Sequence, residues 1–166
     1  MIPPVARTWA PRGQTPVLRC AGRWTKISAI SAVCVEPNRR RIALHARFLR
    51  DRNVRSPDVV RFLSLLLKRL RGPVFIVWDN INQHRSVLVK GLLSTTSRLR
   101  LHRFPGYAPE LNPDEFVWAY LKRAVSNTVP TDLPHLKRLI HPPLQRLRQN
   151  QRLLWACVKA SDLPWP

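Results

Sequence analysis

Residues 74–80, with the sequence VFIVWDN, decide the fold class that we predict for this chain. The run from Val74 to Trp78 is apolar and continuous, which is typical of a short strand buried on both faces of a sheet. Helices cover both faces of such sheets, so the run favours an α/β domain. Asp79 and Asn80 then follow the carboxyl end of an interior strand, where ligands and catalytic groups gather in open α/β sheets.

The segments on both sides of this strand alternate between strand and helix patterns, after an irregular arm or loose hairpin over residues 1–22. We expect a single domain over residues 1–166, with a mixed sheet flanked by helices and an antiparallel first pair of strands. Ser56 is expected to cap its helix, and Pro142-Pro143 to interrupt the last one, because proline removes a backbone donor. The expected strands are 24–35, 40–49, 74–78 and 99–104, and the expected helices are 56–71, 86–93, 113–126 and a last segment from Thr131 or Asp132 towards Ala160.

The charge balance points to a polyanionic partner. The chain has 29 Lys and Arg against 9 Asp and Glu, a formal net charge of +20, and 23 of the cations are arginines. The arginine guanidinium matches phosphate oxygens in a bidentate way, so nucleic acid is the leading partner. An arginine-rich proteome from a GC-rich genome is the alternative source of this excess. A hydrophobic share of 45% excludes wholesale disorder.

Cysteine usage and hydropathy favour a cytoplasmic protein. The three cysteines are far apart and form no C-x-x-C pair, which argues against a zinc site or a disulfide framework. No apolar stretch approaches the ~20 residues of a membrane span, and the first residues lack the basic flank and apolar core of a signal peptide. We therefore expect no membrane partner.

Two acidic positions each have a structural and a chemical interpretation. Asp79 either opens the turn into the next helix or needs a cation or metal beside its apolar strand. Glu115 either completes a capping box in the helix start Asn112-Pro113-Asp114-Glu115 or takes part in a site. Asp114 is expected to be a first-turn acid that points away from Glu115. His84 is either a site residue near Asp79 or a helix-start histidine.

The tryptophans have two interpretations as well. They are expected to be core residues or surfaces on which bases stack, and the core is favoured. The tryptophans considered are Trp9, Trp24, Trp78 and Trp118.

Two blocks of sequence resemble the DDE endonuclease domain of insertion-sequence transposases, the bacterial relatives of mariner-type elements. They are WDNINQHR over residues 78–85 and FPGYAPELNPDEFVWAYLK over residues 104–122, and the segment RTWAPRGQTP over residues 7–16 is similar to the stretch after the family's first catalytic strand. The resemblance implies a ribonuclease H-like fold, with Asp79 and Glu115 as the second and third catalytic carboxylates. The supporting positions that it implies are Asn80, His84, Asn112, Trp118 and Lys122.

The same resemblance implies the cofactor, the reaction and the partners. Two Mg²⁺ ions, with Mn²⁺ as a substitute, are expected to be bound by Asp79 and Glu115, since two-metal phosphoryl transfer needs carboxylates to hold the ions. The implied reactions are nicking at element ends and strand transfer into target DNA. The implied partners are both DNAs and, for the full-length enzyme, further copies in a homo-oligomer; the implied location is the bacterial cytoplasm, at the nucleoid when DNA is bound.

The chain departs from the family pattern at its amino end. No acidic residue precedes Glu36, so the first catalytic Asp and its strand are expected to be missing, together with the helix-turn-helix region that recognises element ends. We therefore expect a partial catalytic domain that is inactive by itself. The alternatives are a non-catalytic DNA-binding transposase remnant and a basic RNA-binding protein.

Overall fold

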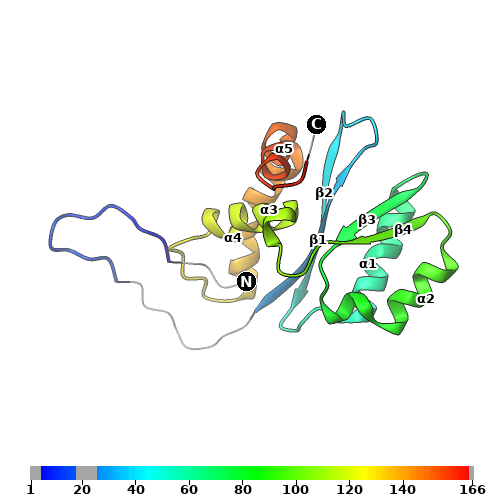
Figure 1. The fold of residues 1–166 in the computed structure, drawn as a ribbon. Coiled ribbons are helices and arrows are strands. Elements are labelled where there is room, and N and C mark those ends of the chain that lie inside the picture. The colour runs from blue at the N-terminus through cyan, green and yellow to red at the C-terminus, as the bar shows by residue number, and fades with distance from the viewer. Residues whose placement is uncertain (1–4, 18–25, 165–166) are drawn as a thin grey trace.

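The computed structural model describes residues 5–17 and 26–164 (Figure 1). Its strands and helices follow the order predicted from the sequence, and the expected α/β class is confirmed. The elements are β1 (Ile27–Val35), β2 (Ile42–Arg50), α1 (Ser56–Arg69), β3 (Val74–Trp78), the 3-10 turn η1 (Asn82–Arg85), α2 (Val87–Thr95), β4 (Leu99–Arg103), the 3-10 turn η2 (Pro109–Leu111), α3 (Pro113–Ala124), α4 (Leu133–Gln149) and α5 (Gln151–Lys159). Within the described ranges no helix is both long and apolar enough to cross a membrane.

The described strands form two small sheets of two strands each, where the sequence predicted one mixed sheet. β1 and β2 pair antiparallel, from Ile27 opposite Arg50 to Val35 opposite Ile42, as the sequence predicted. β3 and β4 pair parallel, and α2 makes the crossover between them that a parallel pair requires. α1 packs against both pairs, because its apolar side chains share one cluster with Ile30 of β1 and Ile76 of β3.

α1 begins one residue earlier than its sequence suggested. The N-cap is Arg55 and not Ser56, which lies inside the helix. The Asp58 carboxylate accepts a hydrogen bond from the Arg55 backbone N–H at 3.0 Å and pairs with the Arg52 guanidinium at 2.6 and 2.7 Å. The acid at the third helical position thus accepts the backbone N–H of the N-cap residue, as the third residue of a capping box does.

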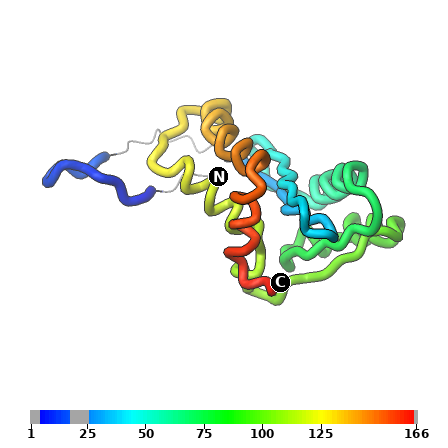
Figure 2. The backbone as a smooth tube through the Cα atoms, turned by 90° about the horizontal axis from the view of Figure 1, so that it is seen from above, coloured from blue at the N-terminus to red at the C-terminus, as the bar shows by residue number. Residues whose placement is uncertain are grey.

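β3 is buried on one face only, which contradicts the prediction of burial on both. Trp78 lies in the cluster around α1, whereas Phe75 and Val77 on the other face are 67% and 50% exposed. The reason is the position of the remaining helices. α4 and α5 contact β2, and α3 contacts β1, so these helices cover one side of the first sheet. α1 and α2 pack behind β3 and β4, and no described helix lies in front of these two strands (Figures 1 and 2).

α4 runs through Pro142 and Pro143, so the predicted interruption at these prolines is wrong. Ile140, Leu144 and Leu147 are buried on both sides of the prolines, and this packing holds the helix in place despite the lost backbone donors. The helix ends instead at Asn150, whose side chain accepts the Leu153 backbone N–H and caps α5.

The amino-terminal arm over residues 5–17 is exposed and has neither helix nor strand, as predicted for its part of residues 1–22. Trp9 is fully exposed in it, so the preferred core position of this tryptophan is wrong, because nothing in the described chain packs over the arm. Cys34 and Cys157 are free thiols. Trp24 and Cys20 lie outside the described residues.

Candidate active site

Asp79 and Glu115 meet at one small cavity. Asp79 follows the last residue of β3, and Glu115 lies in the first turn of α3, 36 positions further along the chain. The loop that joins β4 to α3 closes the space between them. The cavity measures about 180 Å³ and is lined by Asp79, Asn80, Phe104, Pro105, Gly106, Tyr107, Ala108, Pro109, Asn112 and Glu115.

The Asp79 carboxylate is half exposed and is oriented by its neighbours. Its Oδ1 lies 2.9 Å from Nδ1 of His84, whose side chain is only 14% exposed. The His84 ring in turn stacks face to face on the indole of Trp78, with centroids 4.1 Å apart and planes 3° from parallel. Trp78 is a core residue, so the core fixes the imidazole and the imidazole fixes one oxygen of the carboxylate.

Two asparagines hold the loops that carry the acids. Asn80 donates from its side-chain amide to the Phe104 carbonyl at 2.9 Å, and the Phe104 N–H donates to the Trp78 carbonyl at 2.9 Å. These bonds fasten the start of the β4–α3 loop to the end of β3. Asn112 caps α3, as predicted, by accepting the Asp114 N–H at 3.1 Å. The cap sets the direction of the first turn and therefore of Glu115.

The capping-box interpretation of Glu115 is not supported. In the described chain its carboxylate forms no hydrogen bond with the Asn112 backbone, and the side chain is exposed at the cavity. Only the backbone N–H of Glu115 takes part in the helix start, by donating to the Asn112 carbonyl at 3.0 Å. The Glu115 carboxylate therefore has no part in capping α3.

Asp114 is the site residue that sequence reasoning missed. Its Oδ2 accepts hydrogen bonds from the Ser31 hydroxyl at 2.5 Å and from the Trp118 indole N–H at 3.0 Å, while its Oδ1 is buried without a partner in the described chain. Burial raises the pKa of this carboxyl, and the neighbouring Glu115 and Asp79 raise it further against the effect of the two hydrogen bonds. The four-residue spacing to Trp118 was the available signal, because such pairs share a helix face.

Asp114 therefore ties α3 to β1 behind the cavity. Ser31 belongs to β1, and Trp118 packs edge to face against Phe48 of β2 with ring centroids 6.3 Å apart. Trp118 supports the site in this indirect way and does not line the cavity. Lys122, the last expected supporting residue, is exposed near the end of α3 and does not line the cavity either.

The charge at the cavity is unusual for this protein. Despite the net charge of +20, no Lys or Arg of the described residues forms an ion pair with Asp79 or Glu115. No group of three or more His, Cys, Asp or Glu side chains within residues 5–17 and 26–164 is arranged to hold a metal ion. The cavity thus offers two carboxylates that no Lys or Arg of the described residues neutralises, which is a suitable but small set of ligands for a hard divalent cation.

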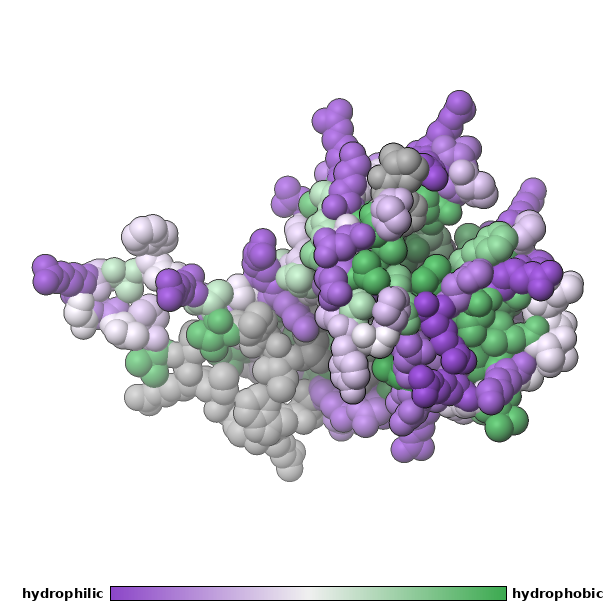
Figure 3. Space-filling model, in the orientation of Figure 1, coloured by the Kyte–Doolittle hydropathy of each residue, from purple (hydrophilic) through white to green (hydrophobic). Residues whose placement is uncertain are grey.

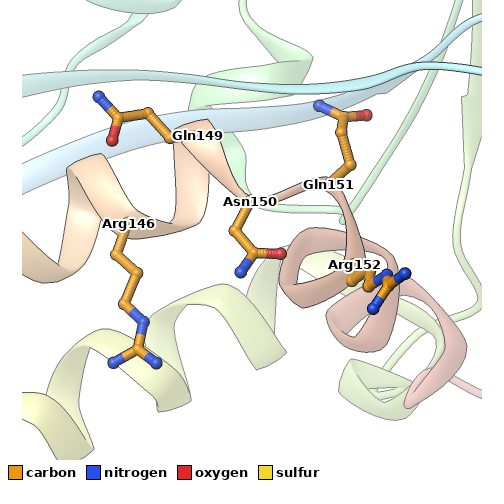
Figure 4. A pocket seen from close by; sticks show the side chains of 5 residues that line it. All are labelled: Arg146, Gln149, Asn150, Gln151 and Arg152. Atoms are coloured by element: carbon orange, nitrogen blue, oxygen red, sulfur yellow. The ribbon is translucent and has the colours of Figure 1, made fainter.

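A second cavity, of about 550 Å³, lies at the junction of α4 and α5 (Figure 4). It is lined by Arg146, Gln149, Asn150, Gln151 and Arg152 and contains no acid or nucleophile. The Gln151 side chain binds both the N–H and the carbonyl of Ile42, at 2.9 and 2.8 Å, which fastens this corner to β2. Although it is larger, this cavity lacks the groups for catalysis, and the acidic cavity is the candidate active site.

Comparisons with known proteins identify the family and the fold of the chain. The sequence model of the family described as DDE superfamily endonuclease matches residues 2–137. The fold is similar to that of the Mos1 mariner paired end complex with Mn (TM-score 0.64, 16% identity, 93% of this chain and 47% of that chain) and of the Mos1 Strand Transfer Complex (TM-score 0.65, 17% identity, 93% and 46%). The catalytic domain of Mos1 mariner transposase is also similar (TM-score 0.57, 14% identity, 80% and 74%).

These matches define the extent of the likeness. The chain spans about half the length of the chains in the two Mos1 complexes. The likeness to the Mos1 catalytic domain agrees with the ribonuclease H-like fold that the sequence motifs implied. No curated protein sequence matches the chain.

Proposed function

Because the chain belongs to the DDE superfamily endonuclease family, we propose that it is the catalytic domain of a DNA transposase, with Asp79 and Glu115 as catalytic carboxylates. One observation carries the proposal. The two acids are far apart in the sequence, line the same cavity, and form no ion pair with a Lys or Arg of the described chain. Mos1, of similar fold, forms a paired end complex with Mn and a strand transfer complex, which supports both the reaction and a divalent metal.

The residues at the cavity suit a divalent metal of the Mg²⁺ or Mn²⁺ type. Mg²⁺ prefers oxygen ligands and is commonly held by one or two carboxylates together with waters and substrate phosphates. Asp79 and Glu115 would be the carboxylate ligands, and two ions are proposed as in other phosphoryl-transfer sites. Ions held there by Asp79 and Glu115 would supply activation of the attacking oxygen and stabilisation of the leaving oxygen of the phosphodiester.

The other residues of the site position these acids. His84 holds one oxygen of Asp79 by its 2.9 Å contact, which limits rotation of the carboxylate. Asn112 and Asp114 fix the first turn of α3 and so the direction of Glu115. Neighbouring side chains therefore hold both carboxylates in place before any metal binds. Such preorganisation favours metal binding.

DNA is the proposed substrate, and the arginine excess is proposed to hold its phosphates. Phosphate contacts by Arg and Lys are largely independent of base sequence, so they would supply affinity and position rather than recognition of element ends. The proposed organisation is a single catalytic domain over residues 1–166. In the full-length enzyme we propose a homo-oligomer, because paired DNA ends require more than one active site acting together.

We propose that this chain does not cut DNA by itself. The family motif implies three carboxylates, and the described residues bring two to the cavity. A transposase remnant that binds DNA without cutting it is the second candidate, and it shares this expectation. The two candidates differ in metal binding, because a remnant that has lost catalysis has no need to keep a functional metal site.

The test is a calorimetric titration of the purified chain with Mn²⁺. We expect binding by the unaltered chain, and a loss of at least about tenfold in affinity for Asp79→Asn and for Glu115→Gln, since removing a ligand exceeds the ~10–100-fold effect of outer-shell changes. Glu110→Gln is the matched control, because Glu110 is an exposed acid in the same loop that does not line the cavity. Its Mn²⁺ affinity should stay within about twofold of that of the unaltered chain.

One outcome would overturn the proposed site, and another would overturn the proposed inactivity. Equal Mn²⁺ affinity in all four proteins would remove the metal site. Nicking of supercoiled plasmid with Mg²⁺ that Asp79→Asn abolishes would instead show that the chain is active alone, and would overturn the inactivity while supporting the site.

A further inference from the structure

An uncovered face of the β3–β4 sheet lies next to the candidate active site. We call it the open face and define it by Phe75 and Val77 of β3 and Arg100 and His102 of β4. Successive side chains of a strand point to opposite faces, and these four alternate with residues that pack towards α1. Arg100 and His102 are exposed, like Phe75 and Val77.

The four side chains form a continuous surface. The register places Phe75 beside Arg100 and Val77 beside His102, and the rings of Phe75 and His102 are stacked, with centroids 6.2 Å apart and planes 25° apart. Figures 1 and 2 show α1 behind this sheet and no helix in front of it. Figure 3 looks at that uncovered side and shows hydrophobic and hydrophilic side chains interspersed over the β3–β4 half of the molecule.

The chemistry of the open face fits a nucleic acid better than a protein. Large exposed apolar side chains gathered on a sheet mark a binding surface, and the arginine beside them adds a positive charge to it. Stacked rings beside an arginine suit a polyanion with flat bases, and the net charge of +20 attracts such a partner. Because bases inside a duplex are stacked on both faces, an unpaired strand is the form of DNA that offers free bases to Phe75.

We propose that the open face binds unpaired DNA, with a base on the Phe75–His102 pair and a phosphate near Arg100. The position of the open face gives this binding a role that rests on the proposed function. Val77 precedes Asp79 by two residues, so a strand on the open face lies beside the acids at the end of β3. The face would hold a DNA end whose strands have separated at the cavity.

The test measures binding of a labelled oligothymidylate of about 12 nucleotides by fluorescence anisotropy, with EDTA present; this length covers the usual site sizes. Phe75→Ala should weaken binding roughly tenfold, because one stacked base contributes ~1–3 kcal/mol. Phe75→Trp keeps an aromatic ring at this position and should bind the oligothymidylate as tightly as the unaltered chain does. Affinity for a duplex of the same length should change less than about twofold in both variants.

Matched variants separate stacking from charge and from folding. Val87→Ala removes an apolar side chain that is 82% exposed on α2, away from the open face, and should leave binding unchanged. Arg100→Gln should weaken binding and reduce the slope of log affinity against log salt by about 0.7, the value for one phosphate contact on a single strand. Circular dichroism should be the same for all variants, since the altered side chains are exposed.

The result that would overturn the proposal is single-strand binding that neither Phe75→Ala nor Arg100→Gln changes. A Phe75→Ala effect as large on the duplex as on the single strand would also overturn it. Tenfold tighter binding of the matching oligouridylate would assign the face to RNA instead. Failure of the proposed function is a separate result, because Asp79→Asn and Glu115→Gln are read out by Mn²⁺ titration and should leave oligothymidylate binding intact.

Discussion

The Asp114 carboxylate supports a sharp stability prediction, because one of its oxygens has two partners and the other has none. Asp114→Ala removes the acceptor for the Ser31 hydroxyl and the Trp118 indole N–H. Losing the two bonds costs about 2–4 kcal/mol, and relief of the buried oxygen without a partner returns about 1–2 kcal/mol. We therefore expect the free energy of unfolding in urea to fall by about 2 kcal/mol.

Asp114→Asn gives the matched comparison. One amide oxygen can keep both hydrogen bonds, and the amide nitrogen occupies the place of the unpartnered oxygen, so the change at pH 7 should be below about 1 kcal/mol. Burial raises the pKa of Asp114, so its favourable contribution is complete below the unfolded value of 3.8 and is lost as pH rises through the folded pKa. The difference in free energy of unfolding between the unaltered chain and Asp114→Asn should thus be smaller at pH 7 than at pH 3.5. Equal losses for Ala and Asn would refute this account of the network.

Two further predictions concern Asp58 and His84. The hydrogen bond from Arg52 lowers the pKa of Asp58 from 3.8 to about 2, so its contribution is present above pH 4 and is lost as pH falls towards 2. Asp58→Asn should lower the free energy of unfolding in urea by about 1–2 kcal/mol at pH 7 and by almost nothing at pH 2. The loss at pH 7 is modest because Arg52 is half exposed and its charge is screened. A loss that stays the same at both pH values would contradict a stabilising ion pair. His84→Ala should weaken Mn²⁺ binding roughly tenfold by freeing the Asp79 carboxylate, whereas an unchanged affinity would mean that the histidine has no positioning role.

Local patterns in the sequence predicted the elements well, and they failed where distant packing decides. VFIVW correctly marked β3 and placed Asp79 at its end, because a short apolar run followed by a polar pair is a local signal. The exposure of Phe75 could not be predicted, since it depends on α3, α4 and α5 covering β1 and β2 instead of β3. The predicted helix interruption at Pro142 and Pro143 was wrong for a similar reason, because the packing of the buried residues around them stabilises α4.

The same distinction applies to the site. The motif around Asp79 and Glu115 pointed to both acids from the chain alone, and their shared cavity agrees with that interpretation. Asp114 was taken for an ordinary first-turn acid, because its partner Ser31 is 83 positions away and the bond between them depends on the tertiary fold. Long-range polar contacts of this kind leave no periodic signal in a sequence.

The most direct test of the site is anomalous diffraction at the manganese absorption edge from crystals soaked in MnCl₂. Our account predicts anomalous density in the cavity between α3 and the end of β3, within coordination distance of carboxylate oxygens from both Asp79 and Glu115. Manganese bound by only one of these acids, or bound only elsewhere on the protein, would contradict it.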